Sequence, residues 1–306
     1  MTTPKNFIAL EEWSSQGLRE LLVLCARLKS ELKQGVRRSP LAGRNIGLIF
    51  EKASLRTRVS FEVGINQLGG AAIVLGDMAG RLGEREPIAD FARVASRYVD
   101  GLVVRTYGED IIKELARHAT VPVINGLTDG SHPCQAMGDV FTLLERWGSL
   151  EGRTLSYIGD SNNVCHSLLQ AAVKLGLKMR VASPRGYEFP EALQKWGRDQ
   201  GFEFFDRPEP AAEGADALYT DVWTSMGQEK EKAQRLRDFQ GFQVNGDLMR
   251  RASKEVLLMH CLPAHRGEEI SDEAIESRHS IVFDQAENRL HIQKAVLEKL
   301  MAKGLS

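Results

Sequence analysis

The chain has 306 residues with 40 Lys plus Arg, 41 Asp plus Glu and a formal net charge of -1. At about 150 residues per domain this length predicts two domains, and the balanced charge argues against a basic nucleic-acid-binding surface or an acidic disordered tail. Apolar runs are only strand-sized, so we expect no membrane span. The start has no basic segment followed by an apolar stretch, so we expect no secretory signal. The four cysteines form no CxxC pair, which favours reduced thiols in a cytoplasmic protein.

The first half of the chain alternates short apolar runs with helical patterns. An amphipathic helix begins after Ser14 or Ser15, because apolar residues recur at three-to-four spacing from Leu18 to Leu32. Strands are predicted at 45–50, 72–75, 101–105 and 121–125. These runs lack polar alternation, which is typical of parallel strands covered on both faces.

The second half repeats this alternation after a long predicted helix at 133–147. That helix ends at Gly148, and we place the domain boundary there. Further strands are predicted at 154–158, 179–182, 217–220, 256–259 and 281–284, followed by a terminal helix from about 287. The fold class is therefore α/β, with two domains that each contain a parallel sheet flanked by helices.

Polar residues concentrate where the predicted strands end. In open parallel sheets, ligands bind outside the carboxyl ends of the strands, so we expect the active site in the cleft at these ends. Arg105, Asp221 and His260 each stand at or directly after such an end. Polar loops follow strands in many proteins, but Arg and His at so many ends favour a functional site.

The segment SLRTR, residues 54–58, follows the first strand and opens a helix. Ser54 is a candidate cap, and the first helical turn offers unpaired N–H groups beside two arginines. Arginines are unfavourable at this end of a helix unless an anion is bound, although one solvated arginine and one salt-bridged arginine are the simpler alternative. The chain has no Gly-Lys pair and no Gly-x-Gly, so the predicted phosphate belongs to a small metabolite rather than to ATP or NAD.

Two His/Cys segments follow later strands. His132 stands at the start of the long helix and could donate to a carbonyl oxygen, although a lone His there is often a cap or a packed residue. His260-Cys261 directly follows a strand, which strengthens a functional interpretation. The spacings do not match common zinc sites, so no metal is expected, and no local signature supports Cys261 as a covalent nucleophile.

The segment DVWTSMG, residues 221–227, combines a carboxylate, hydroxyls, an apolar wall and a glycine. Asp221 could bind an amine, and the glycine could act as a hinge for a mobile substrate loop. An ordinary helix-initiating turn is the alternative.

Five motifs, SLRTR, HPCQ, GDSNN, DVWTSMG and HCLPA, resemble in order and separation those of the aspartate/ornithine transcarbamoylases. DxWxSMG with HCLP resembles the ornithine branch of that family. The resemblance implies transfer of a carbamoyl group from carbamoyl phosphate to the δ-amine of L-ornithine, giving L-citrulline and phosphate without a cofactor. It also implies a carbamoyl phosphate-binding domain at 1–147, an ornithine-binding domain at 148–286 and a C-terminal helix at 287–306 that returns to the first domain.

The resemblance also implies the site residues. Those for carbamoyl phosphate are Ser54, Leu55, Arg56, Thr57, Arg58, Arg81, Arg105, His132, Gln135 and Arg289. Those for ornithine are Asn163, Asp221, Ser225, Met226, Cys261 and Leu262. The residues with implied catalytic roles are Arg56, Thr57, Arg105, His132, Asp221 and Cys261. This assignment suits the chemistry, because attack on carbamoyl phosphate creates an oxyanion and releases an anionic phosphate.

Two positions depart from the family pattern: Leu55 stands where a threonine is common, and Arg81 where many relatives have glutamine. In the family, the loop around Arg81 reaches the site of a neighbouring subunit, so a homotrimer with shared sites is implied, with no nucleic-acid or membrane partner. The protonated δ-amine cannot attack, and Asp221, Cys261 and the leaving phosphate are the candidate proton acceptors.

Two alternatives remain open at the level of sequence. One is a carbamoyltransferase for another amine, putrescine or N-acetylornithine. The other is a non-catalytic, anion-binding relative, against which the presence of Arg56, Arg105, His132 and Cys261 argues.

Overall fold

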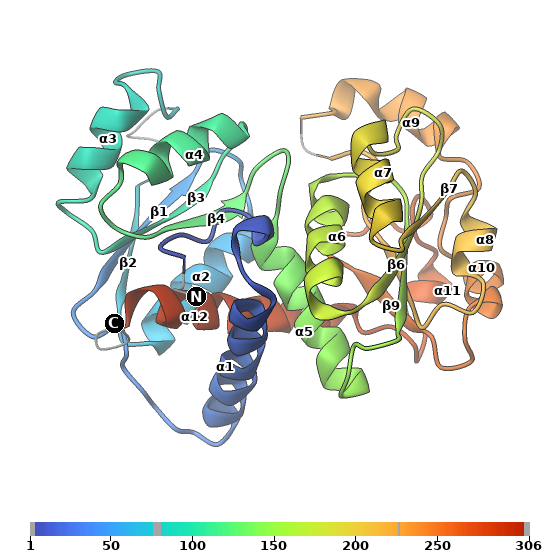
Figure 1. The fold of residues 1–306 in the computed structure, drawn as a ribbon, viewed down its shortest axis with the longest axis horizontal. Helices are drawn as coiled ribbons and strands as arrows, with labels where there is room; N and C mark the ends of the chain where they lie inside the picture. Colours follow the sequence, from blue (N-terminus) through green and yellow to red (C-terminus); the bar gives the residue numbers. More distant parts are fainter. Residues whose placement is uncertain (1–3, 76–80, 226, 303–306) are drawn as a thin grey trace. The chain divides into compact units, whose positions relative to one another are not determined.

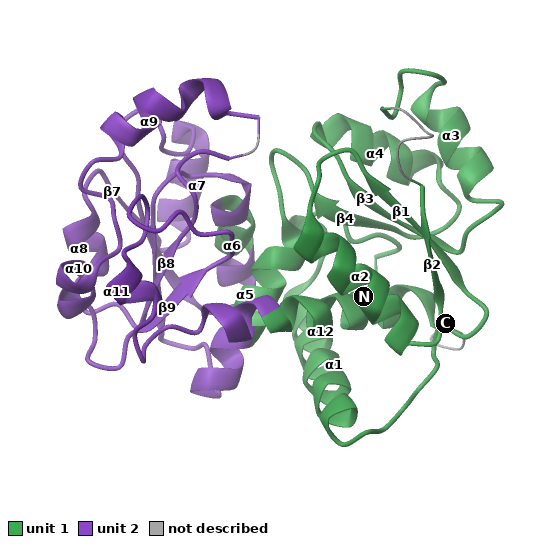
Figure 2. Ribbon diagram, turned by 180° about the vertical axis from the view of Figure 1, so that it is seen from behind, with its two compact units in different colours: residues 1–141, 166–170, 287–306 green, residues 142–165, 171–286 purple. Residues whose placement is uncertain are grey.

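The computed structural model describes residues 4–75, 81–225 and 227–302. The chain divides into two compact units (Figure 2). Unit 1 comprises residues 1–141, 166–170 and 287–306, and unit 2 comprises residues 142–165 and 171–286.

Unit 1 is built on a parallel sheet with the strand order β2-β1-β3-β4 (Figure 1). Its strands are β1 Asn45–Phe50, β2 Ala71–Val74, β3 Gly101–Arg105 and β4 Val123–Leu127. Strand β3 is buried along its whole length, as expected of a central strand covered on both faces. Strand β2 lies at the edge and is only partly buried.

The helices of unit 1 include two whose serine caps follow the sequence prediction. Its helices, some of which also contribute residues to unit 2, are η1 Leu10–Glu12, α1 Ser15–Lys33, α2 Leu55–Gln67, α3 Ile88–Ala95, α4 Glu109–His118, α5 Pro133–Trp147 and α12 Val282–Met301. Ser14 Oγ accepts a hydrogen bond from Gly17 N at 3.0 Å, and Ser54 Oγ accepts one from Thr57 N at 3.3 Å. Both serines are N-caps, which confirms the prediction for Ser54.

Unit 2 contains a second parallel sheet, with the order β7-β6-β5-β8-β9. Its strands are β5 Thr154–Ile158, β6 Lys178–Ala182, β7 Glu203–Phe205, β8 Ala217–Thr220 and β9 Leu257–His260. Its helices are α6 Asn163–Leu175, α7 Glu191–Asp199, α8 Pro208–Ala212, η3 Glu229–Glu231, α9 Lys232–Asp238, α10 Gly246–Arg251 and α11 Asp272–Ile275. The predicted α/β class with two parallel sheets is confirmed.

The predicted strand at 281–284 is wrong, because helix α12 already begins at Val282. Ile281 N donates to Leu258 O at 3.0 Å, so a single residue pairs beside β9 before the chain turns into the helix. Gln285 N then donates to Ile281 O at 2.9 Å and closes the first helical turn. The apolar, β-branched pair at 281–282 resembles a strand in sequence, but its backbone hydrogen bonds continue as a helix.

Within the ranges described above, no helix combines the length and apolar character needed to cross a membrane.

Candidate active site

A buried polar cluster in unit 1 joins three helices. Arg289 on α12 donates to Gln135 Oε1 on α5 and, at 3.2 Å, to Thr57 Oγ1 in the first turn of α2. Gln135 Nε2 donates to Asp139 Oδ1 at 2.7 Å. Because both ends of the Gln135 amide are engaged, the orientation of this side chain is determined, and it links Arg289 to a buried carboxylate that sequence analysis did not single out.

Arg105 and His132 supply further polar atoms to this part of unit 1. Arg105 is the last residue of β3, and His132 precedes α5, where its backbone N donates to Ser167 Oγ at 2.8 Å. Both side chains are buried, and neither Arg105 Nε nor His132 Nδ1 forms a hydrogen bond with the described residues. Buried polar atoms usually have partners, so these two atoms are available to a ligand.

Crowded positive charge dominates the electrostatics of the cluster. Burial, with added repulsion from Arg289 and Arg56, lowers the pKa of Arg105 to about 10. Burial, together with Arg289 and Arg105, lowers the pKa of His132 well below its usual value. At neutral pH the site therefore combines charged guanidinium groups with an uncharged imidazole. An anion would relieve the repulsion among the arginines.

The two arginines of the SLRTR segment differ in their surroundings. Arg56 is exposed, yet it is close enough to Arg105 to lower that residue's pKa. Arg58 Nε instead pairs with Glu62 Oε1 at 2.7 Å, in an exposed ion pair along α2. Arg56 thus lies near the buried cluster, whereas the Arg58 side chain pairs with another residue of α2.

Tyr107 is flanked by two cations, only one of which sequence analysis identified. The Arg81 guanidinium lies 5.0 Å from the Tyr107 ring centroid, and Lys52 Nζ lies 4.6 Å from it. Lys52 also forms an ion pair with Asp129 and is buried. A lysine two residues after the end of β1 was the available sequence signal for this second cation.

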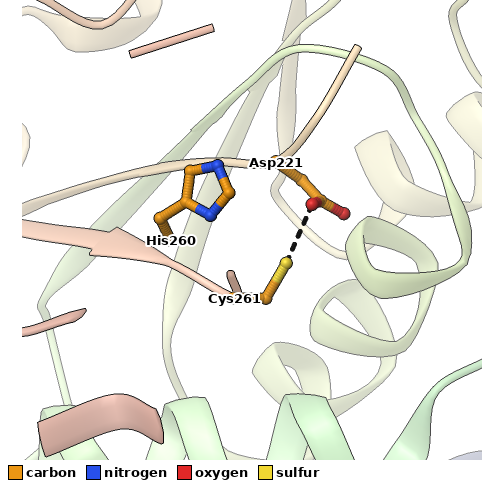
Figure 3. Close-up of side chains that lie close together, drawn as sticks. All are labelled: Asp221, His260 and Cys261. Atoms are coloured by element: carbon orange, nitrogen blue, oxygen red, sulfur yellow. Dashed lines mark hydrogen bonds between the residues drawn. The ribbon is translucent and has the colours of Figure 1, made fainter. Parts of the chain in front are cut away.

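The polar cluster of unit 2 is centred on Asp221, directly after β8. Cys261 Sγ donates to Asp221 Oδ1 at 2.8 Å, and Asn162 Nδ2 donates to Asp221 Oδ2 at 2.7 Å. Figure 3 shows the Asp221–Cys261 hydrogen bond with His260 beside it. Asp221 is largely buried, so the thiol and the carboxylate share a partly desolvated position.

His260 holds the segment after β9 in place. Its Nδ1 accepts a hydrogen bond from Leu262 N at 2.8 Å, and its Nε2 lies 3.0 Å from Glu269 Oε1. An Nδ1 that accepts leaves the proton on Nε2, which donates to Glu269. Asp221, His260 and Cys261 offer ligand atoms within 4.8 Å of one another. Both imidazole nitrogens are engaged, however, so His260 has no lone pair to offer a metal.

The GDSNN segment places a neighbour of the predicted residue against Asp221. Asn163 is the first residue of α6, whereas Asn162 caps the helix and donates to Asp221. Tyr157 OH donates to Asn162 Oδ1 at 3.2 Å and so supports the orientation of the amide. Residue type alone does not show which of two adjacent asparagines contacts Asp221; the capping geometry of α6 distinguishes them.

Arg235 anchors the segment after Asp221 and was also missed from the sequence. Its Nη1 donates to Asp160 Oδ2 at 2.7 Å and to Trp223 O at 2.9 Å. Ser225 N donates to Gln228 Oε1 at 2.9 Å. Met226, predicted to contact ornithine, lies outside the described residues.

Cys261 is expected to be the single cysteine that reacts rapidly with a thiol reagent in the native protein. Cys25, Cys134 and Cys165 are fully buried, and burial raises the pKa of Cys134 to about 12 and that of Cys165 well above its usual value. Cys261 is partly exposed. Titration with an aromatic disulfide should therefore modify one thiol rapidly, and Cys261→Ser should remove that phase. Rapid modification of a second thiol would contradict the structure.

Comparisons with known proteins define the class of this two-unit α/β protein from both halves of the chain. Residues 5–145 match the family model described as aspartate/ornithine carbamoyltransferase, carbamoyl-P binding domain, and residues 151–300 match its Asp/Orn binding domain. The chain belongs to the aspartate/ornithine carbamoyltransferase family.

Individual relatives match over nearly their full length. An ornithine carbamoyltransferase of Symbiobacterium thermophilum is 50% identical over 310 residues, covering 99% of this chain and 100% of the relative. That of Syntrophotalea carbinolica is 48% identical, covering 97% and 99%. The solved ornithine carbamoyltransferase from Pyrococcus furiosus has a TM-score of 0.94 and 46% identity, with 98% of each chain covered.

Proposed function

We propose that this protein is a transferase that moves the carbamoyl group of carbamoyl phosphate to the δ-amine of L-ornithine, producing L-citrulline and phosphate. The observation that carries the proposal is the cationic cluster of unit 1, in which Arg105 and Arg289 lie with an uncharged His132. Full-length relatives named for the same activity support ornithine over putrescine or N-acetylornithine as the acceptor.

The carbamoyl phosphate site combines a helix terminus with fixed donors. The residues assigned to it are Ser54, Leu55, Arg56, Thr57, Arg58, Arg81, Arg105, His132, Gln135 and Arg289. The N-terminus of α2 and Arg56 bind the phosphate, while Arg105, His132 and Thr57 donate to the carbonyl oxygen as it becomes an oxyanion. A neutral His132 suits this role, because its N–H can donate without adding another repelling charge.

The ornithine site is assigned to the Asp221 cluster. Its residues are Asn163, Asp221, Ser225, Met226, Cys261 and Leu262. The Asp221 carboxylate pairs with an ammonium group of ornithine, and it accepts the δ-amine proton either directly or through Cys261, whose thiol takes that proton as it gives its own to Asp221. The departing phosphate is a further proton acceptor. Most of the acceleration comes from positioning two substrates together and from oxyanion stabilisation, so no cofactor is required.

We assign carbamoyl phosphate binding to a first domain, residues 1–147, and ornithine binding to a second domain, residues 148–286. The C-terminal helix at 287–306 is assigned to the first domain, to which the chain returns. The protein is assigned to the cytoplasm and to a homotrimer. An exposed apolar stripe on α2 supports assembly: Leu55, Val59 and Val63 stand four residues apart, with exposed fractions of 77%, 45% and 37%. Such a stripe is more stable when another subunit covers it.

Subunit sharing predicts that two inactive variants restore each other. Arg56→Ala removes a phosphate contact, and Arg81→Glu reverses a charge on the loop assigned to the neighbouring site. In mixed trimers, some sites should receive an intact Arg56 from one chain and an intact Arg81 from another, so activity should return. Differently tagged chains check that subunits exchange. Confirmed hybrid trimers without regained turnover would mean that Arg81 acts within its own chain.

The reaction itself is tested with carbon-13-labelled carbamoyl phosphate and L-ornithine, followed by NMR. The expected result is a ureido carbon signal of citrulline that grows in proportion to released phosphate. Phosphate release without citrulline, at a rate independent of ornithine, would overturn the proposal.

A further inference from the structure

A second cluster of ligand-type side chains in unit 2 is not used by the proposed reaction. It consists of His265, Glu268 and Glu269, which each offer one ligand atom within 4.8 Å of the other two. The distances from His265 Nδ1 are 3.5 Å to Glu268 Oε2 and 4.0 Å to Glu269 Oε2. All three belong to the loop after β9, so one short segment brings them together.

The converging atoms are buried and lack hydrogen bonds. None of His265 Nδ1, Glu268 Oε2 and Glu269 Oε2 forms a hydrogen bond with the described residues. Glu269 is completely buried, and a buried carboxylate oxygen without a hydrogen bond is unfavourable unless a cation lies beside it.

The other oxygens of the two carboxylates have partners. Glu269 Oε1 accepts from His260 Nε2 at 3.0 Å and from His265 N at 2.6 Å. Glu268 Oε1 lies 2.9 Å from Lys232 Nζ. These contacts orient each carboxylate and leave one oxygen of each toward the cluster. In metal sites, the residues that bind the ion are typically held in place by hydrogen bonds or ion pairs through their other polar atoms.

We propose that His265, Glu268 and Glu269 bind a divalent transition-metal ion of the zinc type. One imidazole nitrogen with two carboxylate oxygens suits zinc, whereas magnesium and calcium prefer oxygen-only sets. Metal–ligand bonds of about 2.1 Å in tetrahedral geometry separate ligand atoms by about 3.4 Å, so the present distances need only a small contraction. The fourth position would hold water, because His265 and Glu268 are partly exposed.

The ion would stabilise the segment that carries Cys261. Glu269 contacts both the ion and His260, and His260 accepts from Leu262 N. The metal is thus a structural ligand of this loop, separate from the carbamoyl-transfer chemistry.

The test uses the full-length protein after dialysis against a chelator, with Zn²⁺ alone as the ligand in calorimetry and thermal unfolding. About one ion per chain should bind and raise Tm. His265→Gln and Glu268→Gln should each weaken binding by at least about tenfold. Glu273→Gln, which alters an exposed carboxylate outside the cluster, should leave affinity within about twofold.

Co²⁺ bound to the unsubstituted protein gives a spectroscopic readout that needs no variant. The expected spectrum shows visible bands of a nitrogen–oxygen site and no near-ultraviolet thiolate charge-transfer band, and Cys261→Ser should leave it unchanged. Absence of saturable binding would overturn the proposal, as would unchanged affinity in both cluster variants. Loss of binding in Cys261→Ser would move the ion to the Asp221–Cys261 pair.

Discussion

Arg105→Ala is expected to lower kcat by about 100- to 1000-fold, the usual effect of losing one oxyanion donor. The guanidinium is buried at the end of β3, where water replaces it poorly, and its pKa of about 10 keeps it charged at neutral pH. Steady-state kinetics at saturating carbamoyl phosphate and ornithine measure the effect.

Arg56→Ala should likewise impair catalysis without unfolding the protein.

Two controls separate catalysis from folding in the Arg105 experiment. Arg93→Ala removes an exposed arginine of the same unit and should leave turnover unchanged. Arg105→Met keeps much of the side-chain volume while removing repulsion from Arg289 and Arg56, so its Tm should equal or exceed that of the unmodified protein. Near-normal turnover of Arg105→Ala would contradict the assignment of the oxyanion site.

Asp221→Asn is expected to raise KM for ornithine by about 10- to 100-fold and to change KM for carbamoyl phosphate little. The loss corresponds to one hydrogen bond to a charged group. Asparagine keeps the shape of the side chain but lacks the negative charge that we propose to pair with an ammonium group of ornithine. The effect is measured by varying each substrate at saturation of the other.

The matched control is Asp247→Asn, because the Asp247 side chain is 85% exposed and lies outside the cluster. It should leave both KM values unchanged. Equal increases in both KM values for Asp221→Asn would instead indicate a structural role, which its contacts with Cys261 and Asn162 could provide.

Local signals predicted much of the fold. Ser54 followed by a helical pattern identified the N-cap of α2, and uninterrupted apolar residues identified β3. The strand predicted at 281–284 was wrong because β-branched residues are common in strands. Ile281 N does donate to Leu258 O in β9, but the pairing stops there because the next backbone hydrogen bond, from Gln285 N to Ile281 O, is helical. Such competition between local preference and backbone pairing is decided only in the folded chain.

Sequence motifs named the candidate site residues one by one, but they could not predict the contacts among them. Arg289 and Gln135 are 154 positions apart, so no local pattern indicates their hydrogen bond. Asn162 and Arg235 were missed for the same reason, since their partners Asp221 and Asp160 are distant in sequence and follow the ends of β8 and β5. The cluster around Glu269 depends on complete burial of one carboxylate, a property that residue type does not predict.

Acceptor specificity is measured as formation of the carbamoylated product from carbamoyl phosphate with a panel of acceptors at equal concentrations. The panel consists of L-ornithine, putrescine, N-acetylornithine and aspartate. We expect kcat/KM to be highest for ornithine, and Asp221→Asn to reduce this preference. A higher kcat/KM for putrescine, N-acetylornithine or aspartate, or no product with any of the four, would contradict this expectation.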